Sequence, residues 1–339
     1  MKRKELDTFV AHHKLSHTAV EAALDLSRAR PSEMEIRAFI VRLLRLAGVL
    51  SLAAGIVFFI AANWDAFQVF GRFALLQSVL VSSAAIAFWK PPPHATGRYA
   101  LLMAFIMTGA LLALFGQTYQ TGADVYELFL TWTMLGLAFA IAGQWSVTWA
   151  AWLLVLNVAL ALFCGWRPET GLFWILFSGW NLHLSWLLLG PMILNLLLWA
   201  SIESLQHTRW SPVTARWLGR LALSCAIGFG TWAGTVAIFQ PDYVSAERSA
   251  GGALALLVLL AVFFIVAVYT LRKRSDVFPL TLIAGSLIVL TTSGLGKHLD
   301  FDDTGIFFVL ALWLIASSTV SGRLLMKVVH AWRDEADRA

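Results

Sequence analysis

Long apolar runs, each bounded by polar or charged residues, follow one another along the chain after residue 42. A membrane-spanning helix needs about 20 mostly apolar residues, and ten runs approach or meet this length. They cover residues 43–62, 71–89, 99–116, 126–143, 146–164, 184–203, 216–239, 252–271, 278–294 and 305–322. The pattern predicts an all-α fold, a polytopic membrane bundle of about ten transmembrane helices.

The pattern ahead of the first run is polar and mixed, and it predicts a short helical region over residues 1–42 with one helix near 17–28. Ser32 and Glu35 have the spacing of a capping box, which marks the start of a helix. From Glu33 the helical periodicity continues without a break into the first apolar run. We therefore expect one helix of about 30 residues, roughly 45 Å long, that extends beyond the membrane.

Residues 171–183 are apolar but short, and Gly179, Asn181 and His183 interrupt them. We interpret this stretch as an interfacial or re-entrant segment. The alternative is that residues 171–189 and 190–205 are two separate crossings, which would reverse the orientation of everything that follows. The predicted parts are the N-terminal region 1–42, membrane helices one to five in 43–164, helices six to ten in 165–322, and a tail, 323–339.

Small and polar residues also lie inside the apolar runs. Gly230-x-x-x-Gly234 is a small-residue motif that allows two helix backbones to approach closely. Asn157, Asn195 and Ser286 are polar residues within runs that otherwise avoid polar side chains. No ionisable residue lies convincingly in the middle of a run, which argues against a proton-coupled pump.

Composition narrows the class of protein. Of the 339 residues, 59% are hydrophobic and 13% are charged, whereas a soluble domain has about 25% charged residues. The mean hydropathy is +0.74. A soluble fold cannot cover this much apolar surface, because single cores stop growing near 250–300 residues. Soluble globular proteins, disordered chains and nucleic-acid-binding modules are therefore excluded, and the lipid bilayer is the expected partner.

The positive charges predict the orientation in the membrane. If ten crossings place both termini in the cytoplasm, all but four of the 25 Lys and Arg residues lie on the cytoplasmic side or at the inner helix ends, and the exceptions are Arg72, Arg167, Arg248 and Lys297. This bias follows the positive-inside rule. We expect a multi-pass protein of the bacterial inner membrane with cytoplasmic N- and C-termini.

Two polar segments, residues 61–65 and 116–124, follow apolar runs and fall on the same outer side in this topology. They carry carboxylate, amide and phenol groups, which together are suited to hold a cation or a small polar solute. The polar side chains of the second segment begin close to the headgroup level, where non-helical backbone needs protein or water to satisfy it. The candidate ligand-binding residues are Asn63, Asp65, Gln117, Tyr119, Gln120 and Asp124.

A structural role also explains these residues. Asp124-x-x-Glu127 is a capping pattern for the start of the fourth run. Tyr119 fits the aromatic belt at a membrane interface. Asn63 and Asp65 fit the end of the first membrane helix, so the sequence leaves both readings open.

The stretches GIVFFIAANWDAF and FGQTYQTGADVYELFLTW resemble a family of predicted bacterial inner-membrane proteins, known as domain of unknown function twenty-one fifty-seven. The resemblance covers roughly residues 5–165, and these two stretches carry most of it. It implies a multi-pass bacterial membrane protein. It implies no activity, substrate or catalytic residue.

Motifs for enzymes and metals are missing. The chain contains no His-Glu-x-x-His zinc motif. The two cysteines, Cys164 and Cys225, lie in apolar segments without metal-ligand spacing. Gly294-x-Gly296-Lys297 lacks the rest of a phosphate-binding loop. We therefore expect no enzyme, no cofactor and no metal centre.

Two functions remain. The first is binding or transport of a small polar solute or cation through an outward-facing polar pocket. The second is a non-catalytic membrane scaffold or sensor whose N-terminal helices recruit a cytoplasmic protein. A cavity wide enough for water that reaches Asp124 favours the first function, and a solid bundle favours the second.

Overall fold

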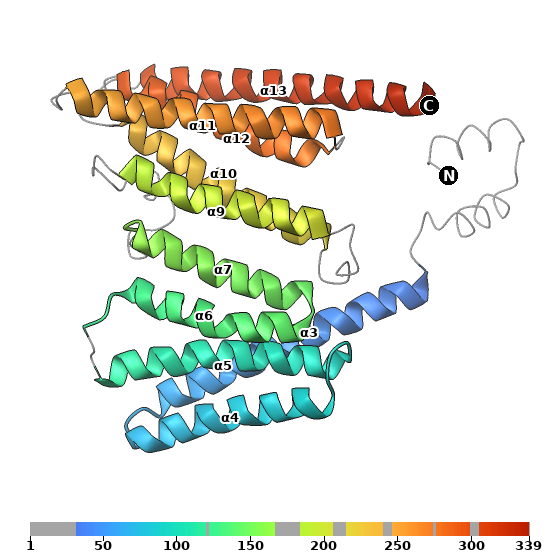
Figure 1. Cartoon of the computed structure of the whole chain (residues 1–339), viewed down its shortest axis with the longest axis vertical. Coiled ribbons are helices and arrows are strands. Elements are labelled where there is room, and N and C mark those ends of the chain that lie inside the picture. Colours follow the sequence, from blue (N-terminus) through green and yellow to red (C-terminus); the bar gives the residue numbers. More distant parts are fainter. Residues whose placement is uncertain are drawn as a thin grey trace, which may run out of the picture. The chain divides into compact units, whose positions relative to one another are not determined.

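The computed structural model describes residues 32–119, 122–166, 184–205, 215–239, 246–273, 276–298 and 305–338. These ranges contain 10 helices that are long and apolar enough to cross a membrane (Figure 1). In chain order they are α3 (Glu33–Ala62), α4 (Val69–Trp89), α5 (Ala95–Tyr119), α6 (Val125–Gly143), α7 (Ser146–Phe163), α9 (Leu184–Leu205), α10 (Arg216–Ile238), α11 (Ala246–Lys273), α12 (Val277–His298) and α13 (Gly305–Arg338).

All ten predicted runs are confirmed as helices, and most boundaries agree within a few residues. The main difference is at α13, which continues as one helix to Arg338 through most of the predicted tail. The residues after Gly322 include neither Pro nor Gly, so nothing in their intrinsic propensity ends the helix.

The start of α3 is also confirmed. The backbone N–H of Glu35 donates to Oγ of Ser32 at 3.2 Å, and the backbone N–H of Ser32 donates to Oε2 of Glu35 at 3.0 Å. This reciprocal pair is the predicted capping box. From it α3 runs for 30 residues without interruption.

The helix predicted over 17–28 and the segment 171–183 lie outside the described residues. The alternative of two crossings divided at residues 189 and 190 is wrong, because α9 is one helix that contains Pro191. Cys164, directly after α7, and Leu184, the first residue of α9, belong to the same hydrophobic cluster. Helix α9 therefore begins at the end of the bundle where α7 finishes.

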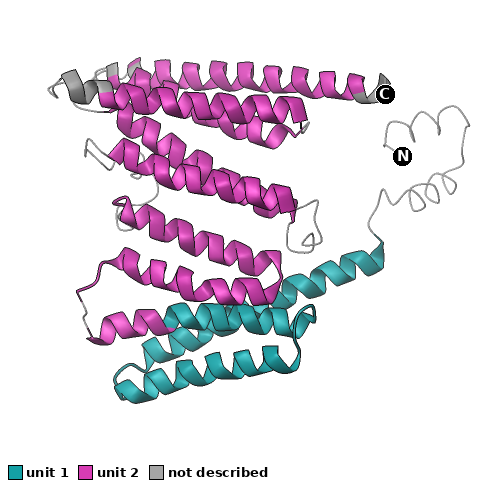
Figure 2. Ribbon diagram, viewed as in Figure 1, with its two compact units in different colours: residues 1–110 teal, residues 111–339 magenta. Residues whose placement is uncertain are grey.

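The chain forms two compact units, residues 1–110 and residues 111–339 (Figure 2). In the first unit, Leu102, Ala104, Phe105 and Met107 of α5 are buried. The hydroxyl of Tyr99 in α5 donates to the backbone carbonyl of Arg42 in α3 at 3.1 Å. This bond ties α5 to α3 near the start of α5.

In the second unit, α10 packs against α7, α9, α11 and α12. Gly230 and Gly234 lie where its neighbours come closest. A Cβ on Gly230 would stand 2.9 Å from Sδ of Met192 in α9, and one on Gly234 would stand 2.6 Å from a methyl of Leu290 in α12. The predicted small-residue motif is thus a site of close helix packing.

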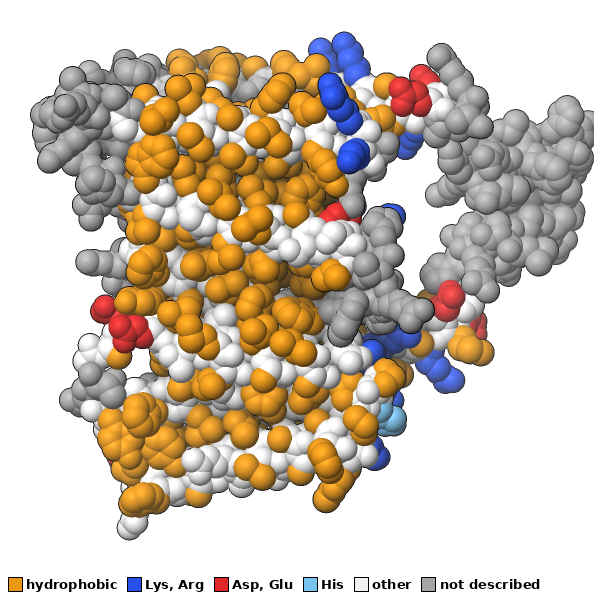
Figure 3. Space-filling model, in the orientation of Figure 1, with side chains coloured by type: hydrophobic (Ala, Val, Ile, Leu, Met, Phe, Trp, Pro, Cys, Tyr) orange, Lys and Arg blue, Asp and Glu red, His pale blue; other side chains and the backbone are white. Residues whose placement is uncertain are grey.

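The outer faces of the helices are apolar. Hydrophobic side chains cover most of the face seen in Figure 3. On α11 and α13 even Phe264, Ile265, Phe308 and Ile315 are more than half exposed. Soluble monomers rarely expose apolar surface of this extent, so these faces belong in contact with lipid.

Candidate functional site

The first candidate segment follows α3, in the unit of residues 1–110. Asn63 is the C-cap of α3, and its Nδ2 donates to the carbonyl of Phe59 at 2.8 Å. The amide of Asn63 therefore satisfies the end of its own helix. Asp65 lies in the following turn with an exposed side chain.

Arg72 of α4 organises this turn. Its guanidinium lies 3.6 Å from the centroid of the Trp64 ring, and Nη2 donates to the carbonyl of Trp64. The side chain is only 9% exposed. Our reading of the sequence counted Arg72 only as a positive charge on the outer side. The sequence does contain a signal for this cation–π pair, because an arginine stands just inside an apolar run, eight residues after a tryptophan.

In the second candidate segment, helix α5 continues to Tyr119, three residues beyond the predicted run 99–116. Near the headgroup level a helix is more stable than irregular backbone, because a helix satisfies its own backbone hydrogen-bonding groups. Tyr119 is 57% exposed, and its ring centroid lies 4.8 Å from that of Phe115. Gln120 lies outside the described residues.

A pocket of about 660 Å³ lies between the last turns of α5 and the first turns of α6, within the unit of residues 111–339. Its lining is apolar on the helix faces and polar at several edges. The lining residues are Leu112, Ala113, Phe115, Gly116, Gln117, Gly122, Ala123, Asp124, Val125, Glu127, Leu128 and Thr131.

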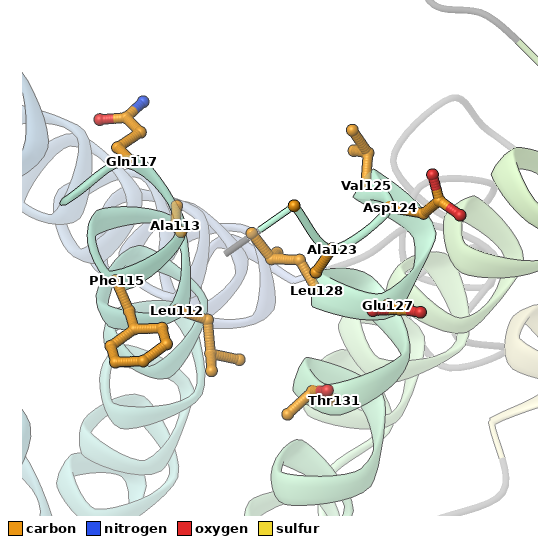
Figure 4. A pocket seen from close by; sticks show the side chains of 12 residues that line it. Leu112, Ala113, Phe115, Gln117, Ala123, Asp124, Val125, Glu127, Leu128 and Thr131 are labelled. Atoms are coloured by element: carbon orange, nitrogen blue, oxygen red, sulfur yellow. The ribbon is translucent and has the colours of Figure 1, made fainter. Parts of the chain in front are cut away.

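Apolar and polar groups occupy different parts of this pocket. Figure 4 shows Leu112 of α5 and Leu128 of α6 directed into the space between the two helices. The carboxyl groups of Asp124 and Glu127 lie on the α6 side and point away from α5, and Gln117 stands at the end of α5 (Figure 4). The pocket thus has an apolar interior, and its polar groups lie at the rim, where the two carboxyl groups point away from that interior.

Asp124 occupies the N-cap position of α6, but its side chain makes no capping hydrogen bond. The first turn is closed by backbone alone, since the N–H of Glu127 donates to the carbonyl of Asp124 at 3.0 Å. Asp124 is therefore the N-cap residue, but the predicted capping hydrogen bond from its side chain is absent. Sequence reasoning missed Glu127 as a site residue because it assigned that carboxylate to the cap.

The first turn of α6 packs against the end of α7. The ring of Tyr126 in α6 meets Phe163 of α7 edge-on, with 5.2 Å between the centroids. Farther along the same pair of helices, Nε1 of Trp152 donates to the carbonyl of Thr133 at 2.9 Å. These contacts fix the α6 side of the pocket against α7.

The structure brings together two of the six predicted ligand residues, Gln117 and Asp124, which line one pocket. Tyr119 is in the same unit but is not part of the lining. Asn63 and Asp65 belong to the other unit. The shared pocket of six residues stays a prediction.

The polar groups available at the pocket are carboxylates, an amide and a hydroxyl. The described lining residues include two carboxylates, one amide and one hydroxyl, but no Lys, Arg or His. In the described part of the chain, no group of three or more His, Cys, Asp or Glu residues is placed to hold a metal ion. An acidic rim without a metal-ligand cluster suits a positively charged or hydrogen-bonding solute.

Ten apolar helices with lipid-compatible faces define a multi-pass membrane protein. Residues 7–149 match the model of a family described as "Predicted membrane protein (DUF2157)". This N-terminal segment, which contains both candidate stretches, is similar to that family, and the resemblance found in the sequence is confirmed. No curated protein and no solved structure matches the chain.

Proposed function

We propose that this membrane protein binds a small polar solute or cation in the pocket between α5 and α6. The observation that carries the proposal is an open, mostly apolar pocket of about 660 Å³ whose lining includes Gln117, Asp124 and Glu127. Ligand pockets typically measure about 300–1,000 Å³. A cavity at Asp124 is what separates a binding protein from a solid scaffold, so the pocket favours binding.

The sign of the charge favours a cation. Asp124 and Glu127 both carry exposed carboxylates at the rim, and the described lining residues bring no positive charge to offset them. A concave surface lined by one sign of charge concentrates ions of the opposite sign. The proposed role is binding, without catalysis.

The test is isothermal titration of tetramethylammonium and of Ca²⁺ into the purified protein in lipid nanodiscs. The double variant Asp124→Asn/Glu127→Gln is expected to bind the cation about 5- to 30-fold more weakly, because each exposed ion pair contributes up to about 1 kcal/mol. Glu335→Gln removes an exposed carboxylate of α13 outside the pocket and serves as the matched control. Unchanged affinity in the double variant, or no cation binding by the parent protein, contradicts the proposal.

We also propose that the protein lies in the bacterial inner membrane with both termini in the cytoplasm. The support is the charge distribution, in which all but four of the 25 Lys and Arg residues fall on one side of a ten-helix topology. Under this orientation the pocket at the start of α6 opens to the outside of the cell.

A second candidate is a scaffold or sensor that recruits a cytoplasmic protein through residues 1–42. The observation that favours it is the unbroken course of α3 over 30 residues. Such a helix is about 45 Å long, which exceeds a hydrocarbon core of about 30 Å. Its first turns therefore extend from the bilayer and continue without a break into the membrane-spanning part of α3.

Deletion of residues 1–30 tests this second role in cells. The truncated protein is expected to reach the membrane in normal amount, since α3 and its capping box are intact, yet to reproduce the phenotype of a full gene deletion. Membrane fractionation provides the control for protein level. Wild-type behaviour of the truncated protein counts against the scaffold role. A reporter protein fused to the N-terminus that shows no cytoplasmic activity counts against both this role and the proposed orientation.

A further inference from the structure

Three chain segments meet in the first unit at the end where α5 begins. The hydroxyl of Tyr99 in α5 donates to the backbone carbonyl of Arg42 in α3 at 3.1 Å. A Cβ on Gly97 would overlap the carbonyl oxygen of Lys90, so the residue that follows α4 packs directly on the backbone of α5. The start of α5 therefore holds α3 and the connection between α4 and α5 next to each other.

Positive charges gather at this junction. Arg42 and Arg45 are three positions apart on α3, which makes their side chains neighbours on the helix surface. Both are exposed, as is Lys90, and we call these three residues the basic cluster. Arg98 in the first turn of α5 adds a further positive charge. Figure 3 shows Lys, Arg and His side chains at this end of the unit.

The protein supplies no nearby acidic residue to neutralise the basic cluster. Residues 36–64 and 66–123 contain neither Asp nor Glu. Glu35 accepts from the backbone of Ser32 in the capping box and lies about 10 Å along the helix axis from Arg42, which is about one Debye length at physiological salt. Among the described residues, the basic cluster forms no ion pair.

Arg220 of α10 shows the contrasting arrangement in the second unit. Its Nη2 donates to both carboxylate oxygens of Asp276 at 3.2 Å, so the protein itself provides the counter-charge. The counter-charge for the basic cluster has to come from its surroundings. At the end of a membrane helix these surroundings are lipid headgroups and water.

The neighbouring apolar side chains favour a lipid as the source of this counter-charge. Phe88 and Trp89, directly before Lys90, are 83% and 79% exposed. Leu44, which stands between the two arginines of the cluster on α3, is 64% exposed. Long Arg and Lys side chains extend along such apolar surface and place their charge at the headgroup level. A ligand that satisfies both kinds of side chain has an anionic head and an apolar tail.

We infer that this junction is a binding site for an anionic phospholipid, whose phosphate is held by the basic cluster and whose acyl chains lie along Phe88, Trp89 and Leu44. Basic residues beside a membrane helix attract anionic headgroups, and each strengthens binding roughly fivefold. Because the cluster joins α3 to the connection between α4 and α5, it forms a discrete site on the first unit. The site shares no residue with the pocket between α5 and α6, so the inference is independent of the proposed function.

The test is native mass spectrometry of the protein released from nanodiscs of phosphatidylcholine with a small share of phosphatidylglycerol. The variant Arg42→Gln/Arg45→Gln/Lys90→Gln is expected to bind phosphatidylglycerol about 10- to 100-fold more weakly than the parent protein. The matched control, Arg323→Gln/Lys327→Gln/Arg333→Gln, removes three exposed positive charges from α13. This control is expected to bind phosphatidylglycerol within about twofold of the parent protein.

Two outcomes of this comparison overturn the inference. Equal losses in the two variants would show that the net charge of the protein attracts the lipid and that the junction is no discrete site. A parent protein that retains phosphatidylglycerol no better than phosphatidylcholine would show that the junction does not select an anionic headgroup.

Further measurements exclude misfolding and a free anion as explanations. Arg42→Lys/Arg45→Lys keeps both charges and is expected to retain the lipid, and loss of the lipid from this variant with an unchanged unfolding midpoint contradicts the inference. Higher salt is expected to release phosphatidylglycerol from the parent protein, because salt screens exposed charges; retention at every salt concentration contradicts the role of the basic cluster. Glycerophosphoglycerol, the headgroup without acyl chains, is expected not to displace the lipid, and displacement identifies a site for free anions instead.

Discussion

Replacing Gly234 by valine is expected to destabilise the helix packing around α10 by about 1–3 kcal/mol, the usual cost of overpacking a core. A Cβ at this position would lie 2.6 Å from a methyl of Leu290 and 2.8 Å from a methyl of Leu259. Leu259 is fully buried at 0% exposure, so it has no free space into which to move. The measurement is the unfolding midpoint of the purified protein in a denaturing-detergent titration.

Gly228→Val is the matched control, because it adds the same side chain to the same helix. A Cβ on Gly228 meets no atom within 4 Å. Gly228→Val is therefore expected to change the midpoint by much less than Gly234→Val. Equal midpoints for the two variants would show that α10 does not pack as closely at Gly234 as the structure describes.

The course of the helices was predictable because the bilayer imposes one demand on every segment. About 20 apolar residues must satisfy their own backbone groups, so hydropathy alone locates a crossing. Helix α10 illustrates this, since the predicted run 216–239 matches Arg216–Ile238. The capping box at Ser32 was equally local, because it depends on residues three positions apart.

The helix ends were less predictable because hydropathy marks where the apolar environment stops and not where the helix stops. Polar residues at Gln117 and Thr118 ended the predicted third run, yet α5 continues to Tyr119. Oγ1 of Thr118 donates to the carbonyl of Leu114 at 2.7 Å, which lets a polar side chain remain inside the helix. The same limitation hid the extension of α13 to Arg338.

The sequence could predict only those parts of the candidate site whose residues lie close together along the chain. Gln117 and Asp124 line one pocket because a short connection joins the helices that carry them. Grouping Asn63 and Asp65 with them required a tertiary arrangement that no periodicity specifies. Arg72 was missed for a related reason, since its stacking on Trp64 depends on how the turn between α3 and α4 folds back.

Two buried asparagines join α7 and α9 inside the apolar bundle. Nδ2 of Asn157 donates to Oδ1 of Asn195 at 3.1 Å, and Nδ2 of Asn195 donates to Oδ1 of Asn157 at 2.8 Å. Each amide also donates to a carbonyl of its own helix, Leu153 at 2.8 Å and Pro191 at 2.9 Å. Asn195 is 0% exposed and Asn157 is 9% exposed, so neither amide has water as a substitute partner.

Asn195→Leu is expected to destabilise the protein by about 1–3 kcal/mol, because it leaves the amide of Asn157 buried with its interhelical partner removed. Leucine has the same branched arrangement of heavy atoms as asparagine and is larger, so the substitution leaves no cavity. The double variant Asn157→Leu/Asn195→Leu is expected to be destabilised by less than the sum of the two single variants, since it removes the stranded amide as well as the bond.

The detergent titration used for Gly234→Val gives the four midpoints of this double-mutant cycle. Ser201→Ala provides the matched control, because its hydroxyl is exposed and donates only to the carbonyl of Leu197 within α9. Interhelical hydrogen bonds in membrane proteins contribute about 0.6–2 kcal/mol, so a coupling in this range is expected. Strict additivity of the two substitutions would mean that the asparagine pair does not hold α7 to α9.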